Sequence, residues 1–434
     1  MKMLTFTCAL FLLAGSRPWA RAADSTDPIR APEAAISIDA LVADALASNP
    51  ELAFYQAEIA AALGERRAAG AWPNPELGAE VGHKRAHEPA GGLAGEGAAW
   101  SVSLAQPLEF PGRMALRKAI ASRQIEIAEL GLAQFRATLA SRVREVAYRL
   151  FIAQAEADAA VQAAARGQEL AEVLVQRDPA GINPLLESRL IEASVITLNE
   201  RAAEAATHVR GLAMELNQLR GKPLDTDVRI SPAKLDFPPL DSSGALVRKA
   251  MTNNFDIRAQ QLELEQQGLK VDLTRKDRWK EITVSPFYAQ EKAGERESVV
   301  GVGVSIPLPL WNRNTGNIQA AEARHQQAEA AVFSTQREVE RALRGHIASY
   351  QARLAQMARW RPGLAESLRE AAELADRHYR LGAVPVSIYV ELQEKYLEAL
   401  KALLSTQAEA LQSRQQIMLL TGDTGADSSM NHKD

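Results

Sequence analysis

A unit of about 200 residues occurs twice in this chain, and this duplication constrains the fold more than any other feature of the sequence. The stretch LVADALASNPEL, from Leu41 to Leu52, corresponds to LVRKAMTNNFDI, from Leu246 to Ile257, at an offset of 205 residues. The stretch QPLEFPGR, residues 106–113, corresponds to IPLPLWNR, residues 306–313, at an offset of 200. Each copy is therefore expected to contain the same elements in the same order.

The duplication also sets the expected domain boundaries. We predict a leader at 1–22, a first structural repeat at 23–230, a proline-rich linker at 231–240, a second repeat at 241–423 and a flexible tail at 424–434.

Each repeat is expected to contain one very long helix, a tight turn and a shorter helix. These are predicted at 114–175 and 184–219 in the first copy, and at 314–380 and 385–420 in the second. In the first long helix, apolar residues recur at spacings of three and four: Leu132, Phe135, Leu139, Val143, Val146 and Leu150. At ~1.5 Å per residue, such a helix is roughly 90 Å long, far longer than an ordinary globular core. The fold class is therefore mainly α, built from duplicated long-helix hairpins.

Four short stretches alternate apolar with small or polar residues and are predicted strands, at 76–84, 99–106, 282–290 and 299–306. In the last of these, valines at 300, 302 and 304 alternate with glycines at 301 and 303. One face of each strand would suit lipid and the other water. Two amphipathic hairpins on a periplasmic helical protein would give the same pattern, and this alternative stays open.

The strands bear on how the chain could cross a membrane. After the leader, no stretch approaches 18 consecutive apolar residues, so a spanning segment could only be a closed barrel. The smallest membrane barrels need about eight strands, so a chain with four must oligomerise to close one.

The first residues predict export. Lys2 precedes an apolar run at 3–13, and alanines at 20 and 22 offer a cleavage site before Ala23. The only cysteine, Cys8, lies inside this leader, so no disulfide or thiolate metal site is expected. Ser16 stands where a lipidated cysteine would have to be, so no lipid anchor is expected. The net charge of −4 becomes −7 once the three basic residues of the leader are lost, which is unfavourable for nucleic-acid binding.

The leader, the duplicated order and two tip turns, 181–184 (GINP) and 381–385 (LGAVP), together resemble the TolC family of outer-membrane factors over residues 36–423. The segments 107–113 (PLEFPGR) and 305–318 (SIPLPLWNRNTGNI) are similar to its CzcC branch, which serves cobalt, zinc, cadmium, nickel or copper efflux. The resemblance implies a homotrimer with an α-helical barrel in the periplasm and a twelve-stranded transmembrane β-barrel in the cell outer membrane, in contact with its lipid. The implied partners are a periplasmic adaptor (membrane fusion) protein and an inner-membrane RND pump.

A strand-to-helix motif within these segments contains Pro107, Pro307, Pro309, Trp311, Asn312 and Arg313. Proline lacks the backbone donor and fixes φ, which suits a strand that stops pairing and bends into a helix. Asparagines at 312, 314 and 317 could supply acceptors for the unpaired N–H groups at the helix start. A generic strand-to-helix loop would contain similar residues.

The resemblance also implies a periplasmic gate beside the tip turns, where Gly181, Leu381 and Gly382 would contact the adaptor. The gate positions of the family fall on Glu187 and Tyr379, which would form a latch, and on Glu391, which would form an acidic constriction. Two further positions depart from the family pattern, because Ile388 and Val384 replace an acid and an arginine. The alternative is that both glutamates are ordinary solvated helix residues.

The sequence contains none of the motifs GxxxxGK[ST], GxSxG or HExxH, so no enzyme, cofactor or resident metal is predicted. His83, His87 and Glu88 could suggest a metal site, but they fall at a strand end and its loop. The expected function is an exit duct for divalent heavy-metal cations. Two alternatives remain, a multidrug or type I secretion factor and a periplasmic coiled-coil scaffold.

Overall fold

The computed structural model describes residues 35–89, 91–175, 182–231, 235–279, 281–293, 295–361 and 363–423, all within one compact unit of residues 35–434. The predicted leader, the predicted tail and Gly181 lie outside the described residues.

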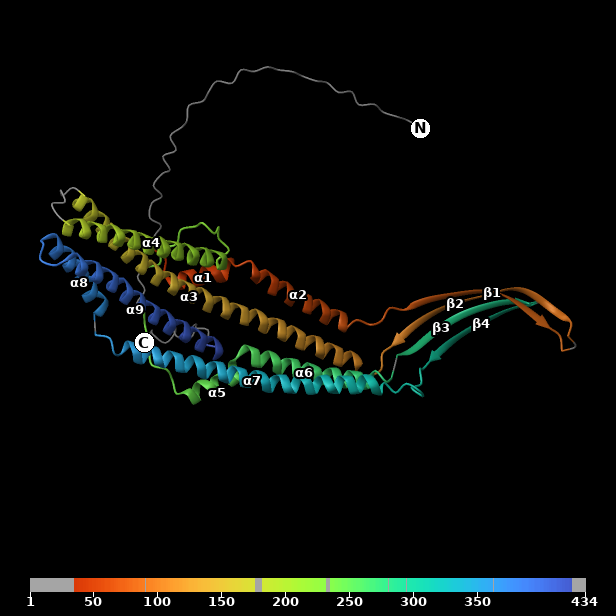
Figure 1. The fold of residues 1–434 in the computed structure, drawn as a ribbon. Coiled ribbons are helices and arrows are strands. Elements are labelled where there is room, and N and C mark those ends of the chain that lie inside the picture. Colours follow the sequence, from red (N-terminus) through yellow and green to blue (C-terminus); the bar gives the residue numbers. More distant parts are fainter. Residues whose placement is uncertain are drawn as a thin grey trace, which may run out of the picture. The chain divides into compact units, whose positions relative to one another are not determined.

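Helices account for most of the described chain (Figure 1). They are α1 (Ile38–Ser48), α2 (Glu51–Ala69), α3 (Arg113–Val175), α4 (Ile182–Leu219), α5 (Ser243–Asn253), α6 (Phe255–Lys276), α7 (Thr315–Met357), α8 (Leu364–Arg380) and α9 (Val386–Leu420). The longest, α3, has 63 residues and begins one residue before its predicted start. In the described part of the chain, no helix has a segment both long and apolar enough to cross a membrane.

The strands form one antiparallel sheet in the order β1-β2-β3-β4. They are β1 (Glu76–His87), β2 (Leu93–Leu108), β3 (Ile282–Ala293) and β4 (Glu295–Ser305). Pairing between β2 and β3 joins the two halves of the chain in one sheet. A mainly helical fold with a small four-stranded sheet is thus confirmed, and the strands extend further into their hairpin loops than the alternation predicted.

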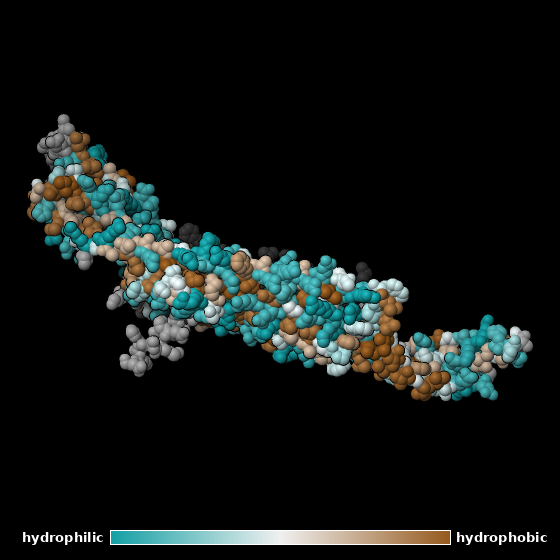
Figure 2. Space-filling model, turned by 90° about the horizontal axis from the view of Figure 1, so that it is seen from below, coloured by the Kyte–Doolittle hydropathy of each residue, from teal (hydrophilic) through white to brown (hydrophobic). Residues whose placement is uncertain are grey.

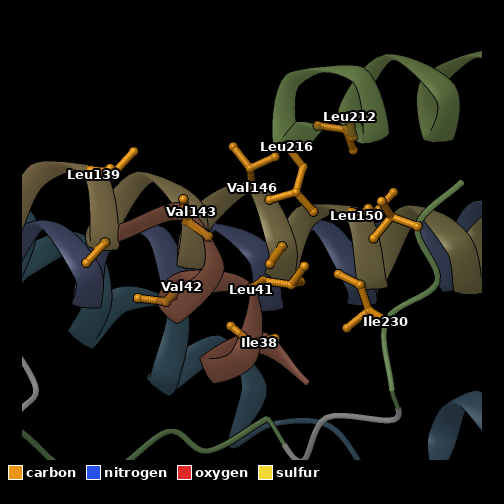
Figure 3. Close-up of a cluster of buried hydrophobic side chains, with 14 of the residues drawn as sticks. Ile38, Leu41, Val42, Leu139, Val143, Val146, Leu150, Leu212, Leu216 and Ile230 are labelled. Carbon is orange, nitrogen blue, oxygen red and sulfur yellow. The ribbon is translucent and has the colours of Figure 1, made fainter. Parts of the chain in front are cut away.

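The long helix α3 is the spine of the first half. Its apolar stripe packs against α1 and α4 in a buried cluster that includes Leu41, Val143, Leu150 and Leu216 (Figure 3). Farther along, α3 also packs against α6 and α9, which belong to the second half. The long helix α3 therefore packs against shorter helices from both halves of the chain.

The two halves repeat one specific junction between a short helix and the end of a long one. Asn49 follows α1 and donates its side-chain N–H to the carbonyl of Leu219, at 2.9 Å. Asn254 follows α5 and donates to the carbonyl of Leu420, at 3.0 Å. Both asparagines are buried, and each satisfies one of the carbonyls left unpaired at a helix end.

The predicted helix at 314–380 is wrong, because it is interrupted between α7 and α8. The helix α7 ends at Met357, and α8 begins after Gly363, whose φ of +72° lies in the left-handed region. The sequence across this break reads RWRPG, residues 359–363. Proline cannot continue the hydrogen-bond ladder, and it disfavours helical geometry in the residue before it. The first repeat has no proline at this point, so α3 runs uninterrupted.

Candidate functional site

The register of the sheet gathers apolar side chains on one face. Cross-strand pairs join Leu77 to Leu104, Val102 to Tyr288, and Tyr288 to Val300. The face formed by these and the alternate residues beside them is called the apolar sheet face: Leu77, Ala79, Val81, Trp100, Val102, Leu104, Val284, Pro286, Tyr288, Val300, Val302 and Val304. Nine of its large hydrophobic residues are exposed in the single chain: Leu77, Val81, Trp100, Val102, Leu104, Tyr288, Val300, Val302 and Val304. Such an extended exposed apolar surface indicates contact with lipid or another apolar partner.

The opposite face of the sheet consists mainly of small and polar residues, with Phe287 and Val299 as apolar exceptions. Ser101 and Ser103 of β2 and Ser285 of β3 lie there, together with Gly301 and Gly303 of β4. The predicted alternation therefore separates two chemically different faces across all four strands.

Charged residues occupy the hairpin end of the sheet. Lys84 pairs with Glu291 and lies 3.4 Å from Glu297, while Arg85 lies 3.2 Å from Glu96. His83 also contacts Glu96, at 3.4 Å. Among the described residues, no three His, Cys, Asp or Glu side chains gather in a way that could hold a metal ion. The pairing of His83, together with the exposure of its side chain, is typical of a solvated strand end.

The strand-to-helix motif lies where β4 ends and α7 begins. The strand ends at Ser305, two residues before Pro307, and Pro309 and Trp311 follow in the connection. Trp311 is 94% exposed, and Arg313 is also exposed. Pro107 differs, because it lies inside β2 and pairs with Thr283 in the sheet.

Of the three asparagines of this motif, only Asn312 acts as predicted, because it accepts a backbone N–H at the helix start. The side chain of Asn312 accepts from the backbone N–H of Asn314, at 2.9 Å. Asn314 itself is left-handed, with φ of 60°, and its side chain makes no cap bond to α7. Its side-chain N–H donates instead to the carbonyl of Thr274 in α6, at 2.9 Å, which ties the two helix ends together. The Asn317 side-chain N–H donates to Asn314 Oδ1, at 2.6 Å, so it serves a side chain and not an orphan N–H group.

The second tip turn has the geometry of a helix end closed by glycine. Gly382 has φ of +71°, and its N–H donates to the carbonyl of Tyr379, at 2.9 Å. The N–H of Ala383 donates to the carbonyl of His378, also at 2.9 Å. A residue with a side chain is strained at such a φ, which accounts for glycine here. Leu381 is exposed beside it.

Two of the three predicted gate residues, Tyr379 and Glu391, lie close to this turn along their helices. Tyr379, near the end of α8, stacks on Tyr389 of α9, with ring centroids 5.6 Å apart. Glu187 is exposed near the start of α4, and Glu391 is exposed on α9. The Glu187–Tyr379 latch and the Glu391 ring involve adjacent helices in an assembly, and they stay predictions.

A cluster of buried polar side chains at the tip was not predicted. It comprises Arg166 of α3, Asp376 of α8, and Tyr389 and Gln393 of α9, and is called the tip polar cluster. Arg166 Nη1, Asp376 Oδ1, the Tyr389 hydroxyl and Gln393 Oε1 are buried without a hydrogen-bond partner among the described residues. Burial raises the pKa of Tyr389 to about 12, and the negative charge of Asp376 adds to the effect.

Only part of this cluster is visible in the sequence. Gln393 interrupts an apolar stripe of α9 that includes Val386, Tyr389 and Tyr396, so a polar residue at a core position was the available signal. Its side-chain N–H donates to the carbonyl of Ala372 in α8, at 2.9 Å. The positions of Arg166 and Asp376 opposite it depend on how three helices pack, which no local pattern specifies.

Known proteins share the duplicated architecture of this chain. The profile of the family described as "Outer membrane efflux protein" matches twice, at residues 41–221 and 246–423. The cobalt-zinc-cadmium resistance protein CzcC of Cupriavidus metallidurans is 28% identical over 294 residues, which span about two thirds (66%) of each chain. The nickel-cobalt-cadmium resistance protein NccC of Alcaligenes xylosoxydans xylosoxydans is 25% identical, over 76% of this chain and 73% of that protein.

Solved structures share the fold. The Campylobacter jejuni outer membrane channel CmeC superposes with a TM-score of 0.70 at 15% identity, over 91% of this chain and 89% of that one. CusC gives a TM-score of 0.65 at 17% identity, over 90% and 92%. The predicted resemblance to the TolC family and its CzcC-like branch is confirmed. With both repeats matched, the chain belongs to the outer membrane efflux protein family.

Proposed function

We propose that the protein is the outer-membrane exit channel of a tripartite efflux system and that divalent heavy-metal cations are its cargo. The observation that carries this proposal is the open four-stranded sheet, with one continuous apolar face, mounted on helices much longer than the sheet. The family and the metal-resistance relatives support it, and the chain would act as a passive duct from periplasm to exterior.

The height of the apolar sheet face fits a membrane. On the same side of β2, exposed apolar residues continue from Trp100 to Leu108, and eight steps of ~3.3 Å make about 26 Å along the strand, or about 20 Å of height for a strand tilted by ~35–45°. The apolar band of outer-membrane barrels is about 25 Å tall and is flanked by aromatic residues. Here Trp100 and Tyr288 lie at one end, with ring centroids 5.4 Å apart, and Phe110 and Trp279 stack near the other.

The edges of the sheet support assembly into a homotrimer. Among the described strands, β1 pairs only with β2 and β4 only with β3, so each has one unpaired edge. Unsatisfied backbone groups are costly in lipid, and pairing β4 of one copy with β1 of the next would satisfy them. Three copies would contribute twelve strands, which exceeds the minimum of about eight for a membrane barrel.

The helices would then continue the duct through the periplasm to the tip turns. There the periplasmic adaptor protein would contact the region of Gly181, Leu381 and Gly382, and an inner-membrane RND pump would supply the cargo. Glu187 and Tyr379 would latch the closed tunnel, and three copies of Glu391 around one axis would favour cations over anions.

Two experiments test this proposal. Fractionation of membranes, with heat-modifiable migration in gels, separates an inserted trimer from a periplasmic scaffold; a soluble monomer would contradict the channel. Deletion of the gene, followed by growth on zinc, cobalt, cadmium, copper and hydrophobic antibiotics, tests the cargo. Sensitivity to metals alone is expected, whereas sensitivity to antibiotics alone would indicate a multidrug factor.

A further inference from the structure

The junction between helices and sheet carries basic, apolar and aromatic side chains, called the collar. Its basic members are Lys118, Lys276, Arg278 and Arg313, and its exposed apolar members are Trp72, Trp279, Leu308, Leu310 and Trp311. Figure 2 shows hydrophobic side chains gathered where the helices give way to the sheet. A duct for cations does not by itself require positive charge at this level of the molecule.

Contacts between four helix ends bring the collar together. Lys118 of α3 lies against Gly70 at the end of α2, and Lys276 of α6 lies against Gly112 before α3. The bond from Asn314 to Thr274 joins the start of α7 to the end of α6. All four connections between helices and sheet therefore meet at the collar.

Three of the four collar cations have no carboxylate partner among the residues that the structure describes. Among the described residues, no carboxylate lies within 4.0 Å of Lys118, Arg278 or Arg313, whereas the neighbouring Arg113 pairs with Asp277 at 2.9 Å. Lys276 reaches only the carbonyl of Pro111, at 3.5 Å. In the described part of the chain, Lys118, Arg278 and Arg313 are therefore exposed cations without a carboxylate partner.

Helix dipoles do not account for this charge. Cations are favourable at helix C-termini, which fits Lys276 and Arg278, but they are unfavourable at N-termini. Arg313 lies two residues before the start of α7, and Lys118 lies in the second turn of α3. Neither helix has an acidic residue in its first turn. Positive charge thus occurs at helix ends of both polarities, which points to an anion outside the chain.

The apolar members of the collar indicate which kind of molecule the anionic group belongs to. Leu308, Leu310 and Trp311 are exposed and directly continue the apolar sheet face beyond Val304. The Arg278 guanidinium lies 5.5 Å from the Trp279 ring centre, so a cation and an aromatic ring share one position. Basic and aromatic side chains at the edge of an apolar band match the headgroup level of a bilayer.

We propose that the collar binds the headgroups of anionic phospholipids in the leaflet next to the helices. This rests on the proposed function, because it requires the sheet to lie in a membrane. A zwitterionic headgroup would cover the apolar side chains but would leave the surplus positive charge without a counter-charge. An anionic one, such as phosphatidylglycerol, satisfies both.

The test uses the full-length protein in vesicles that contain brominated phosphatidylglycerol or brominated phosphatidylcholine at equal fractions. Quenching of tryptophan fluorescence gives the preference for one lipid over the other. The variant combines Lys118→Gln, Arg278→Gln and Arg313→Gln. The control combines Arg210→Gln, Arg258→Gln and Arg341→Gln, which removes equal charge from the helical body. Each lost collar charge is expected to lower the preference roughly fivefold, and the control is expected to keep it.

The outcomes separate this inference from the channel itself. If the triple variant inserts and keeps the wild-type lipid preference, the proposed headgroup binding at the collar is wrong. The same holds if wild-type protein inserts but shows no preference. Neither result contradicts the proposed channel function. Wild-type protein that does not insert would contradict the channel as well. Loss of the preference on adding inorganic phosphate at constant ionic strength would identify a free-anion site and overturn lipid binding. Exchanging lysine and arginine at the three positions is expected to keep the preference.

Discussion

A charge placed on the apolar sheet face is expected to block assembly in the membrane, and Val302 is the most informative position. It is 66% exposed, lies opposite Pro286 in β3, and stands between Val300 and Val304 on the same face. An arginine at the midplane of an outer-membrane barrel costs ~2–4 kcal/mol. In a trimer the cost arises three times, so Val302→Arg is expected to disfavour insertion by roughly 6–12 kcal/mol if the residue lies at the midplane.

The matched control is the next residue along the same strand. A Cβ at Gly303 would have the carbonyl oxygen of Ser285 as its nearest neighbour, at 3.5 Å, which is an ordinary contact. Gly301 is a poorer control, because its Cβ would lie 2.7 Å from the Phe287 ring. Gly303→Arg therefore adds the same charge at nearly the same depth on the small, polar face, and trimer yield is expected to stay near wild type.

The assay is the amount of heat-modifiable trimer recovered with outer membranes at equal expression. Val302→Arg should shift the protein to degradation products or to the periplasmic fraction, and Gly303→Arg should not. Equal losses in the two variants would refute the assignment of faces. Full insertion of both would refute the contact between this sheet and lipid.

Three further predictions concern the tip and the helix junctions. Tyr379→Phe is expected to destabilise the closed state by ~1–3 kcal/mol and to raise single-channel conductance in planar bilayers. Glu391→Gln is expected to lower the preference for cations over anions in the same bilayers. Wild-type conductance and wild-type ion preference in the two variants would contradict the predicted gate. Asn254→Ala leaves the Leu420 carbonyl unpaired and should lower the free energy of unfolding by ~1–3 kcal/mol in denaturant titrations. The pKa of Tyr389 is raised to about 12 in the folded protein, so the unfolded state, with a tyrosine pKa of about 10, loses this proton first. The free energy of unfolding is therefore expected to be unaffected by this group below about pH 10 and to fall as the pH rises from about 10 to about 12. Tyr389→Phe should remove that fall.

Periodicity made most of the fold predictable. The spacing of apolar residues in 132–150 specifies one buried face of α3, and the alternation at 299–306 specifies the two faces of β4. The strand limits were less predictable, because β1 and β2 extend into the predicted loop, whose residues, such as Arg85 and Glu96, carry no alternating pattern. In this part of the hairpin, the strands are held by the hydrogen-bonded pairing of β1 with β2.

The main error in the predicted fold came from the assumption that the second repeat copies the first. The second long helix was predicted by analogy with α3, although Pro362 and Gly363 have no counterpart in the first copy. These two residues are incompatible with a continuous helix, and the helix is interrupted between Met357 and Leu364. A proline inside an otherwise helical pattern is a stronger signal than similarity between repeats.

The two copies differ in chemistry at the tip, and this difference bears on the gate. At the offset of 201 residues set by Gly181 and Gly382, the buried Tyr389 corresponds to Ser188, and Gln393 corresponds to Glu192. The helix junctions, by contrast, keep asparagine in both copies, Asn49 and Asn254, with the same hydrogen bond. Residues that maintain the framework are thus duplicated, whereas the tip polar cluster belongs to the second copy and to one residue of α3. A break separates α8 from α7, and α8 contacts α9 in two buried clusters. A change in those contacts is therefore expected to move α8 and leave α3 in place.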